Sequence, residues 1–164
     1  MPAKNCLITG ATSGIGLEAS KILAQQGYDL ILVSRSESKL SDLSKNLEEN
    51  FSISTSSYTC DLSSMHETIK VASIIKTNHK EIYCLMNNAG GIFMDFELTE
   101  EGFEKTFVLN HMSYYIVTNI LLDNITSRII NIASEAHRGV KIREDFQCPT
   151  KYNGWRQYKY SKLA

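Results

Sequence analysis

Apolar residues gather in five short runs along the chain, at residues 4–9, 29–34, 56–60, 82–86 and 128–133. Segments in which polar residues alternate with apolar ones at helical spacing separate these runs. The second run, Asp29–Ser34 (DLILVS), is apolar without alternation, as expected of a parallel strand that is covered on both faces. We therefore predict five β-strands, of which the third is the weakest.

The segments between the runs carry apolar residues that recur at the 3.6-residue period of a helix. The stripes are Ile15, Ala19, Ile22 and Leu23 in residues 15–26; Leu40, Leu43 and Leu47 in residues 36–50; and Ile69, Ala72 and Ile75 in a helix that residues 61–64 cap. A further helix is predicted from Thr99 to Leu122. Residues 135–156 then form a polar connection to a last helix.

Strands that alternate with helices imply βαβ units with right-handed crossovers and a parallel sheet. We therefore predict an α/β fold, a doubly wound parallel sheet of the Rossmann type with helices on both faces. One domain is expected to cover residues 1–164. The fold class alone does not name a chemistry, because many functions share it.

Composition excludes several kinds of partner. The chain has 17 basic and 18 acidic residues and a net charge of −1, so it has no general attraction to nucleic acid or to anionic membranes. It has no apolar stretch long enough for a membrane span and no signal-peptide pattern, and we expect a cytoplasmic protein. Cys6, Cys60, Cys84 and Cys148 form no CxxC pair, and the spacing of the histidines is unlike that of metal ligands, so no metal site is expected.

A glycine-rich loop, residues 9–16 (TGATSGIG), joins the first strand to the first helix. Glycine permits positive φ, close approach of a pyrophosphate and tight packing of the helix on the strand. The pyrophosphate would lie on the helix N-terminus, where free amides favour negative charge. The loop predicts a dinucleotide site rather than a plain tight turn, with contacts from Gly10, Thr12, Ser13, Gly14, Ile15 and Gly16.

The end of the second strand bears on the choice of cofactor. An acidic residue there would bind the adenine ribose hydroxyls of NAD, but this chain has Ser34-Arg35-Ser36. An arginine can hold a 2′-phosphate through two hydrogen bonds. We predict NADP in preference to NAD; the alternative is that Arg35 is a solvated surface charge and that NAD is used.

Together these residues resemble the short-chain dehydrogenase/reductase family, whose glycine motif has the form TGxxxGxG. Further motifs follow in the family's order. They are Asp61 and Leu62 at the adenine contact; NNAG at residues 87–90, with Asn88, Ala89 and Gly90 at the cofactor; Asn110 as the catalytic asparagine; Ser134 as the catalytic serine; and Tyr158 with Lys162 as the YxxxK pair.

The resemblance implies a hydride transfer between a nicotinamide and a small carbonyl or alcohol substrate. Tyr158 would move the proton at the substrate oxygen, and Lys162, four residues later on the same helical face, would stabilise the phenolate and hold the nicotinamide ribose. Ser134 would hydrogen-bond the reacting oxygen. Asn110 would complete a proton path through water.

Two stretches, residues 128–139 (RIINIASEAHRG) and 152–164 (YNGWRQYKYSKLA), look like retinol-dehydrogenase-like members of the family. The 23 residues between Ser134 and Tyr158, more than many members have, favour the same subgroup and a lipophilic substrate. The alternative is a general carbonyl reductase with a long insertion.

Members of this family continue well beyond the YxxxK helix. We therefore expect the chain to be the N-terminal part of a longer enzyme, which can form a homo-oligomer in its complete form. The alternative from another class of function is that the short chain acts as a non-catalytic nucleotide-binding or interaction module.

Overall fold

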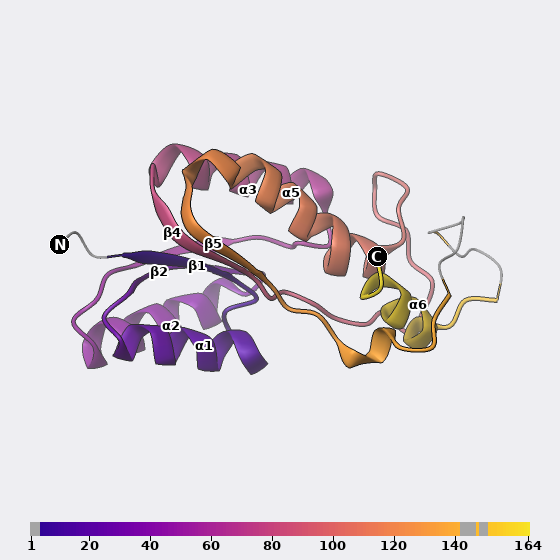
Figure 1. Cartoon of the computed structure of the whole chain (residues 1–164), viewed down its shortest axis with the longest axis horizontal. Coiled ribbons are helices and arrows are strands. Elements are labelled where there is room, and N and C mark those ends of the chain that lie inside the picture. The colour runs from indigo at the N-terminus through magenta and orange to yellow at the C-terminus, as the bar shows by residue number, and fades with distance from the viewer. Residues whose placement is uncertain (1–3, 142–146, 148–150) are drawn as a thin grey trace.

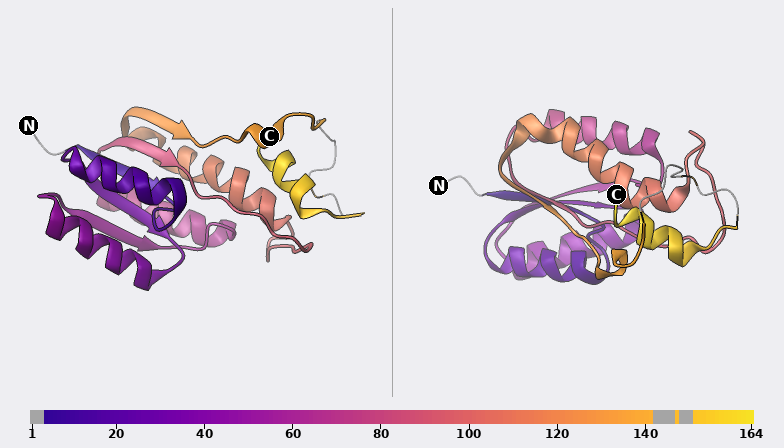
Figure 2. Two further views of the ribbon diagram at one scale, coloured as in Figure 1. Left: turned by 90° about the horizontal axis from the view of Figure 1, so that it is seen from below. Right: turned by 45° about the vertical axis from the view of Figure 1, so that its right-hand side comes forward.

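The structure is a computed structural model that describes residues 4–141, 147 and 151–164, so Cys148 lies outside the described residues. Its centre is a sheet of parallel strands in the order β3-β2-β1-β4-β5. The strands are β1 (Asn5–Thr9), β2 (Asp29–Ser34), β3 (Thr55–Thr59), β4 (Ile82–Asn87) and β5 (Ile125–Asn131). The orange strand β5 forms one margin of the sheet (Figure 2, left). The predicted α/β fold is confirmed.

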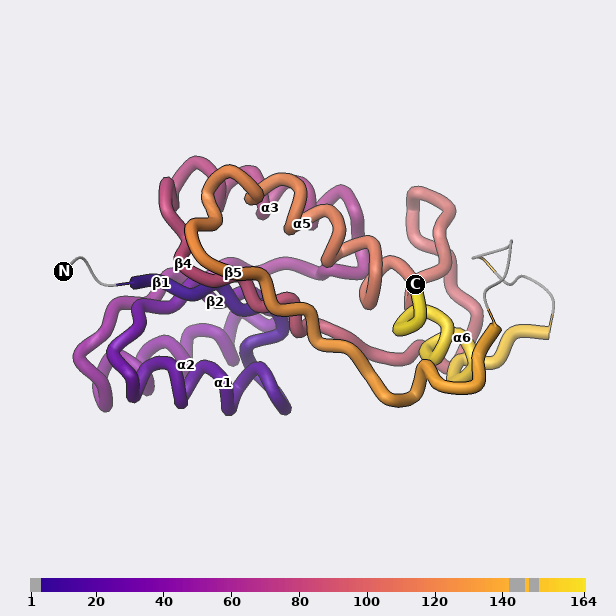
Figure 3. Tube along the Cα trace, viewed as in Figure 1, coloured from indigo at the N-terminus to yellow at the C-terminus, as the bar shows by residue number. Residues whose placement is uncertain are grey.

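Helices cover both faces of the sheet. The long ones are α1 (Gly14–Gln25), α2 (Glu37–Asn50), α3 (Met65–Asn78) and α5 (Ser113–Leu121); the short ones are α4 (Lys105–Phe107) and α6 (Gly154–Ser161). Figure 1 shows α1 and α2 on one face and α3 and α5 on the other. The yellow helix α6 lies beyond the carboxyl ends of the strands, beside the segments that follow β4 and β5 (Figure 3). No helix among the described residues is long and apolar enough to cross a bilayer.

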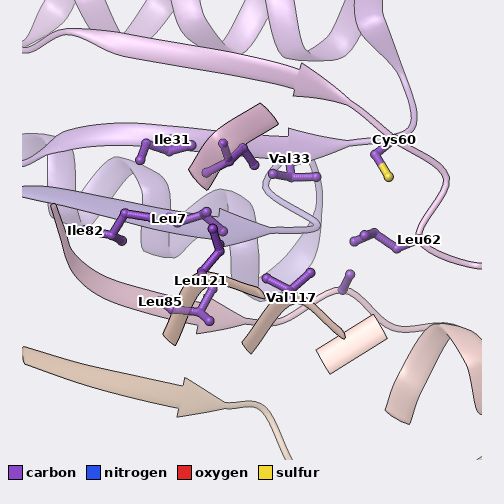
Figure 4. Close-up of a cluster of buried hydrophobic side chains, with 11 residues drawn as sticks. Leu7, Ile31, Val33, Cys60, Leu62, Ile82, Leu85, Val117 and Leu121 are labelled. Carbon is purple, nitrogen blue, oxygen red and sulfur yellow. The ribbon is translucent and has the colours of Figure 1, made fainter. Parts of the chain in front are cut away.

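Two clusters of buried side chains hold the layers together, because successive side chains of a strand point to opposite faces. Leu7 of β1 packs with the cluster under α3 and α5, whereas its neighbours Cys6 and Ile8 pack with the cluster under α1 and α2. Figure 4 shows the first cluster, in which Leu121 and Val117 of α5 lie against Leu85 and Leu7. Burial on both faces explains the uninterrupted apolar run of β2.

The helix predicted from Thr99 is wrong at its start. Leu98 and Glu104 form an antiparallel bridge around a turn in which Gly102 has a φ of +82°, and the helix begins only at Lys105. Glu104 keeps an extended backbone, with ψ at 130°, and caps the helix with its side chain. A wider π-turn, Val108–Met112, then separates α4 from α5.

Some predicted boundaries and stripes also differ. β5 begins at Ile125 and not at Arg128, and the polar connection ends earlier because α6 begins at Gly154. Ile15 and Ile22 are exposed, and the face that α1 buries is Gly16, Ser20 and Ala24. Small residues on this face let the helix lie close to the sheet. On α3, Ile69 is exposed and Thr68 takes the buried position beside Ala72 and Ile75.

Candidate functional site

The carboxyl ends of parallel strands meet at one edge of the sheet, and most of the predicted site residues lie there. Two clefts run along this edge, one of about 280 Å³ and one of about 540 Å³. Both are lined by Gly10, Ser13, Ala89 and Gly90, so the clefts join over the glycine loop. The result is one trough that crosses from the end of β2 to the end of β5.

The backbone of the glycine loop packs closely on itself and on the side chain of Asn88. Gly10 and Gly14 have φ of +67° and +52°, the left-handed region that favours glycine. A Cβ at Gly16 would lie 2.3 Å from Gly10 O and 2.5 Å from Asn88 Nδ2. Gly16 is buried and lines neither cleft, so its place in the loop is explained by packing rather than by contact with a ligand.

The first turn of α1 is open above this loop. A Cβ at Gly14 would meet nothing within 4 Å, and the N-cap Ser13 makes no side-chain hydrogen bond to the helix. The amides of a helix's first turn have no partner inside the helix. Gly14 and the exposed Ile15 of this turn line the trough, and the uncapped N-terminus fits an anionic group.

The segment after β4 is tied to the loop by hydrogen bonds. The backbone N–H groups of Asn88 and Ala89 donate to Thr9 Oγ1 at 2.9 and 3.0 Å. Asn88 Nδ2 donates to Thr9 O at 2.9 Å and to Gly10 O at 3.3 Å. The side chain of Asn88 thus braces the wall of the trough.

The cleft at the end of β2 is lined by Arg35, Asp61 and Leu62, the residues that the sequence analysis assigns to the adenosine end of a dinucleotide. The same cleft includes Lys39, which the sequence analysis missed. Lys39 lies in the first turn of α2, where its amide donates to the N-cap Ser36, and this turn carries it beside Arg35. The signal was present in the sequence as a second cation four residues after Arg35.

Hydrogen bonds hold the hydroxyls of Thr12 and Ser34 and the carboxylate of Asp61 at the end of the trough beside β2. Thr12 Oγ1 and Ser34 Oγ lie 2.7 Å apart, which links the glycine loop to β2. Asp61 Oδ1 accepts from Ser63 N at 2.9 Å and from Ser63 Oγ at 2.7 Å. The orientation of the Asp61 carboxylate is therefore set before any ligand arrives.

The other cleft brings together Ser134, Tyr158 and Lys162. Ser134 caps a 3₁₀ turn (Glu135–His137), where its Oγ accepts from Ala136 N at 3.2 Å and keeps its hydrogen for another acceptor. The ring of Trp155, which the sequence analysis also missed, stacks on Tyr158 with centroids 5.5 Å apart. A half-exposed phenol and a serine hydroxyl thus share one wall of the cleft.

Lys162 follows directly after α6, with its amide donating to Tyr158 O at 3.1 Å. Its Nζ donates to Ile132 O at 2.9 Å and lies 3.4 Å from Tyr114 Oη. Burial lowers the pKa of Lys162. Burial also raises the pKa of Tyr114, with a smaller contribution from Tyr158.

Asn110 does not line the trough. It lies in the π-turn with 3% of its surface exposed and lines another cavity of about 360 Å³, which shares Lys162 with the trough. Its Oδ1 accepts from Gly91 N at 2.9 Å, and its Nδ2 donates to Gly91 O and to Ser161 Oγ, both at 2.9 Å. In this structure Asn110 joins the wall of the trough to α6.

Comparisons with known proteins agree with this geometry. A family model described as short chain dehydrogenase matches residues 4–143. Human retinol dehydrogenase 13 is 34% identical, with 100% of this chain and 52% of that protein aligned, and human retinol dehydrogenase 11 is 31% identical, with 100% and 54% aligned. The chain thus spans about half the length of the curated relatives it matches.

The fold has solved counterparts. A short-chain dehydrogenase from Sphingobium yanoikuyae, in complex with NADPH, superposes with a TM-score of 0.77 at 26% sequence identity. The match covers 98% of this chain and 61% of that one. The chain therefore belongs to the short-chain dehydrogenase family and is similar to its retinol dehydrogenases.

Proposed function

We propose that the protein binds NADP along the trough and transfers a hydride between the nicotinamide and a carbonyl or alcohol substrate. The observation that carries the proposal is the trough itself: Arg35 and Lys39 lie at one end, the uncapped N-terminus of α1 in the middle, and Tyr158 and Lys162 at the other end. This order matches a phosphorylated ribose, a pyrophosphate and a nicotinamide ribose along one dinucleotide.

The residues present fit such a group. A Cβ at Gly10 would lie 2.9 Å from Ala89 Cα, and one at Gly90 would lie 3.0 Å from Asn110 Oδ1. Close packing thus favours glycine at both positions, which leaves these two parts of the trough lining without side chains. Arg35 and Lys39 would hold the 2′-phosphate, and Asp61 would contact the adenine. When bound, the nicotinamide supplies the site from which a hydride leaves or to which it is added.

The chain's own groups then manage the proton and the charge at the substrate oxygen. Tyr158 donates its proton to this oxygen in reduction and accepts it in oxidation. Lys162, held by Ile132 O, places an ammonium group where it stabilises the phenolate. Ser134 donates a hydrogen bond to the same oxygen and helps to orient the substrate.

A lipophilic substrate is the finer proposal. Ile92, Ala133, Ala136 and Trp155 line the cleft beside Tyr158, and Trp155 leaves 54% of its surface exposed there. Apolar lining of this kind favours a substrate with an apolar body. The related retinol dehydrogenases carry a lipid alcohol in their names, which supports the same substrate class.

The test begins with binding. Purified chain is titrated with NADPH and with NADH by calorimetry, and the oxidation of NADPH is followed at saturation with a panel of aliphatic and aromatic aldehydes. We expect tighter binding of NADPH than of NADH, and turnover that rises with the apolar area of the aldehyde.

Failure of the folded chain to bind either nucleotide would refute the proposal. Binding without turnover on any aldehyde would instead support a non-catalytic nucleotide-binding module. Equal affinity for NADPH and NADH would refute the assignment of NADP.

A further inference from the structure

Glu104 is fully buried, with 0% of its surface exposed, at the start of α4. Its Oε1 accepts from Thr106 N at 2.8 Å and lies 2.9 Å from the Tyr152 hydroxyl, whose single hydrogen is shared between Glu104 and Phe93 O, also at 2.9 Å. Its Oε2 accepts from Phe107 N at 2.7 Å and from Gln157 Nε2 at 2.9 Å. A carboxylate only accepts hydrogen bonds and offers two oxygens, so it can serve all these donors at once.

The partner Gln157 belongs to a buried face of α6. Gly154, Gln157 and Ser161 follow the i, i+3, i+7 spacing of one helical face and are all buried. A Cβ at Gly154 would lie 2.3 Å from Phe93 O, and Ser161 Oγ accepts from Asn110 Nδ2 at 2.9 Å. Helix α6 therefore docks through this row of close and polar contacts together with the buried ring of Tyr160.

The next row on α6 faces the trough. Trp155, Tyr158 and Lys162 each follow one residue after the members of the buried row, and all three line the cleft at the end of β5. One residue corresponds to about 100° of rotation around a helix, so the two rows are fixed relative to each other. Any rotation of α6 that releases Gln157 must also move Tyr158.

We propose that Glu104 is a positioning residue of the active site: through Gln157 it fixes the rotation of α6 that presents Tyr158 and Lys162 to the nicotinamide end of the trough. This inference rests on the proposed function. Glu104 does not line either cleft; it caps α4 and reaches the trough indirectly, through its hydrogen bond to Gln157 of α6. The donors around Glu104 explain why a carboxylate is required at this position. The side-chain amide of a glutamine there would place its own N–H₂ group next to one of these donors, where no hydrogen bond can form.

The test uses Gln157→Met, which keeps the length of the side chain and removes its hydrogen bond to Glu104. Arg156→Met is the matched control, because Arg156 is the preceding residue of α6 and is exposed. Two probes separate the ends of the trough. NADPH spans the whole trough, whereas adenosine 2′,5′-bisphosphate occupies only the end at Arg35 and Lys39.

For Gln157→Met we expect kcat to fall about 10- to 100-fold, because small misplacements of reacting groups have effects of this size. The dissociation constant of NADPH should rise about tenfold through lost contacts at Lys162, and that of the bisphosphate should change less than about twofold. Glu104→Gln should shift the ratio of the two constants in the same direction, and Arg156→Met should leave it unchanged.

Two results would overturn the inference while leaving the proposed function intact. The first is that Gln157→Met has the same kcat and the same dissociation constants as the control. The second is that the dissociation constants of NADPH and of the bisphosphate rise equally, which indicates a general loss of folding. If the wild-type chain binds NADPH without turnover, the ratio of dissociation constants decides alone. If the folded wild-type chain does not bind NADPH, the proposed function fails and this inference fails with it.

Discussion

The hydroxyl of Thr9 links the glycine loop to the segment after β4, and its removal has a calculable effect. Thr9 is 2% exposed, and its Oγ1 accepts from the backbone amides of Asn88 and Ala89. Thr9→Val keeps the shape of the side chain but leaves both amides without this acceptor. The variant also removes the longer hydrogen bond that Thr9 Oγ1 donates to Met86 O at 3.5 Å, which is the weakest of the three.

A buried donor without a partner costs about 1–3 kcal/mol, so two would cost about 2–6 kcal/mol. Asn88 is only half-buried, which lets water reach part of its amide, and Ala89 is buried. We therefore expect the free energy of unfolding to fall by about 2–4 kcal/mol, toward the lower part of that range. For a protein of this size the Tm should fall by about 2–4 °C for each kcal/mol.

Urea unfolding followed by circular dichroism measures this change, with the slope m checked for two-state behaviour. The control is Thr59→Val, in which an exposed threonine at the end of β3 receives the same substitution. If Thr9→Val unfolded within about 0.5 kcal/mol of the control, the reasoning about these two amides would be refuted.

Three further predictions concern the site. Tyr158→Phe should abolish turnover of an aldehyde while the NADPH dissociation constant changes less than about twofold, because only the transferable proton is lost. Arg35→Ala and Lys39→Ala should each weaken the binding of NADPH about tenfold more than the binding of NADH in calorimetry, because each removes a charge-assisted contact to the 2′-phosphate. Equal losses of affinity for the two nucleotides would contradict the assignment of NADP. Burial lowers the pKa of Lys162, so just below the ordinary lysine pKa the unfolded chain binds more protons than the folded chain. Stability should therefore rise as the pH approaches the ordinary lysine pKa from below, and Lys162→Met should flatten this rise in urea titrations.

The sequence alone determined the layered fold and indicated the edge of the sheet where the candidate site lies. Runs such as Asp29–Ser34 and the helical stripe of Leu40, Leu43 and Leu47 are local signals, and the structure buries these residues as strand and helix. In a parallel sheet the residues that follow each strand must meet at one edge, so strand order was enough to bring Arg35 and Ser134 to that edge. Tyr158 reaches it on α6.

Only the tertiary structure decided how the segment before Asn110 folds. The pattern from Thr99 onward reads as a helix, but the bridge between Leu98 and Glu104 and the cap that Glu104 provides delay the helix to Lys105. The π-turn then points Asn110 at Gly91 and Ser161 instead of into the trough. Periodicity reports a helical face and contains no information about these long-range hydrogen bonds.

The same limit applies to the anchor of α6. Glu104 and Gln157 are 53 residues apart, and neither lies in a motif. A local pattern cannot pair them, because their contact depends on the approach of Gly154 to Phe93 and on the packing of α6 against α4. The sequence thus indicated most of the chemical groups that line the trough, and the tertiary packing decided how they are oriented and kept Gly16 and Asn110 out of its lining.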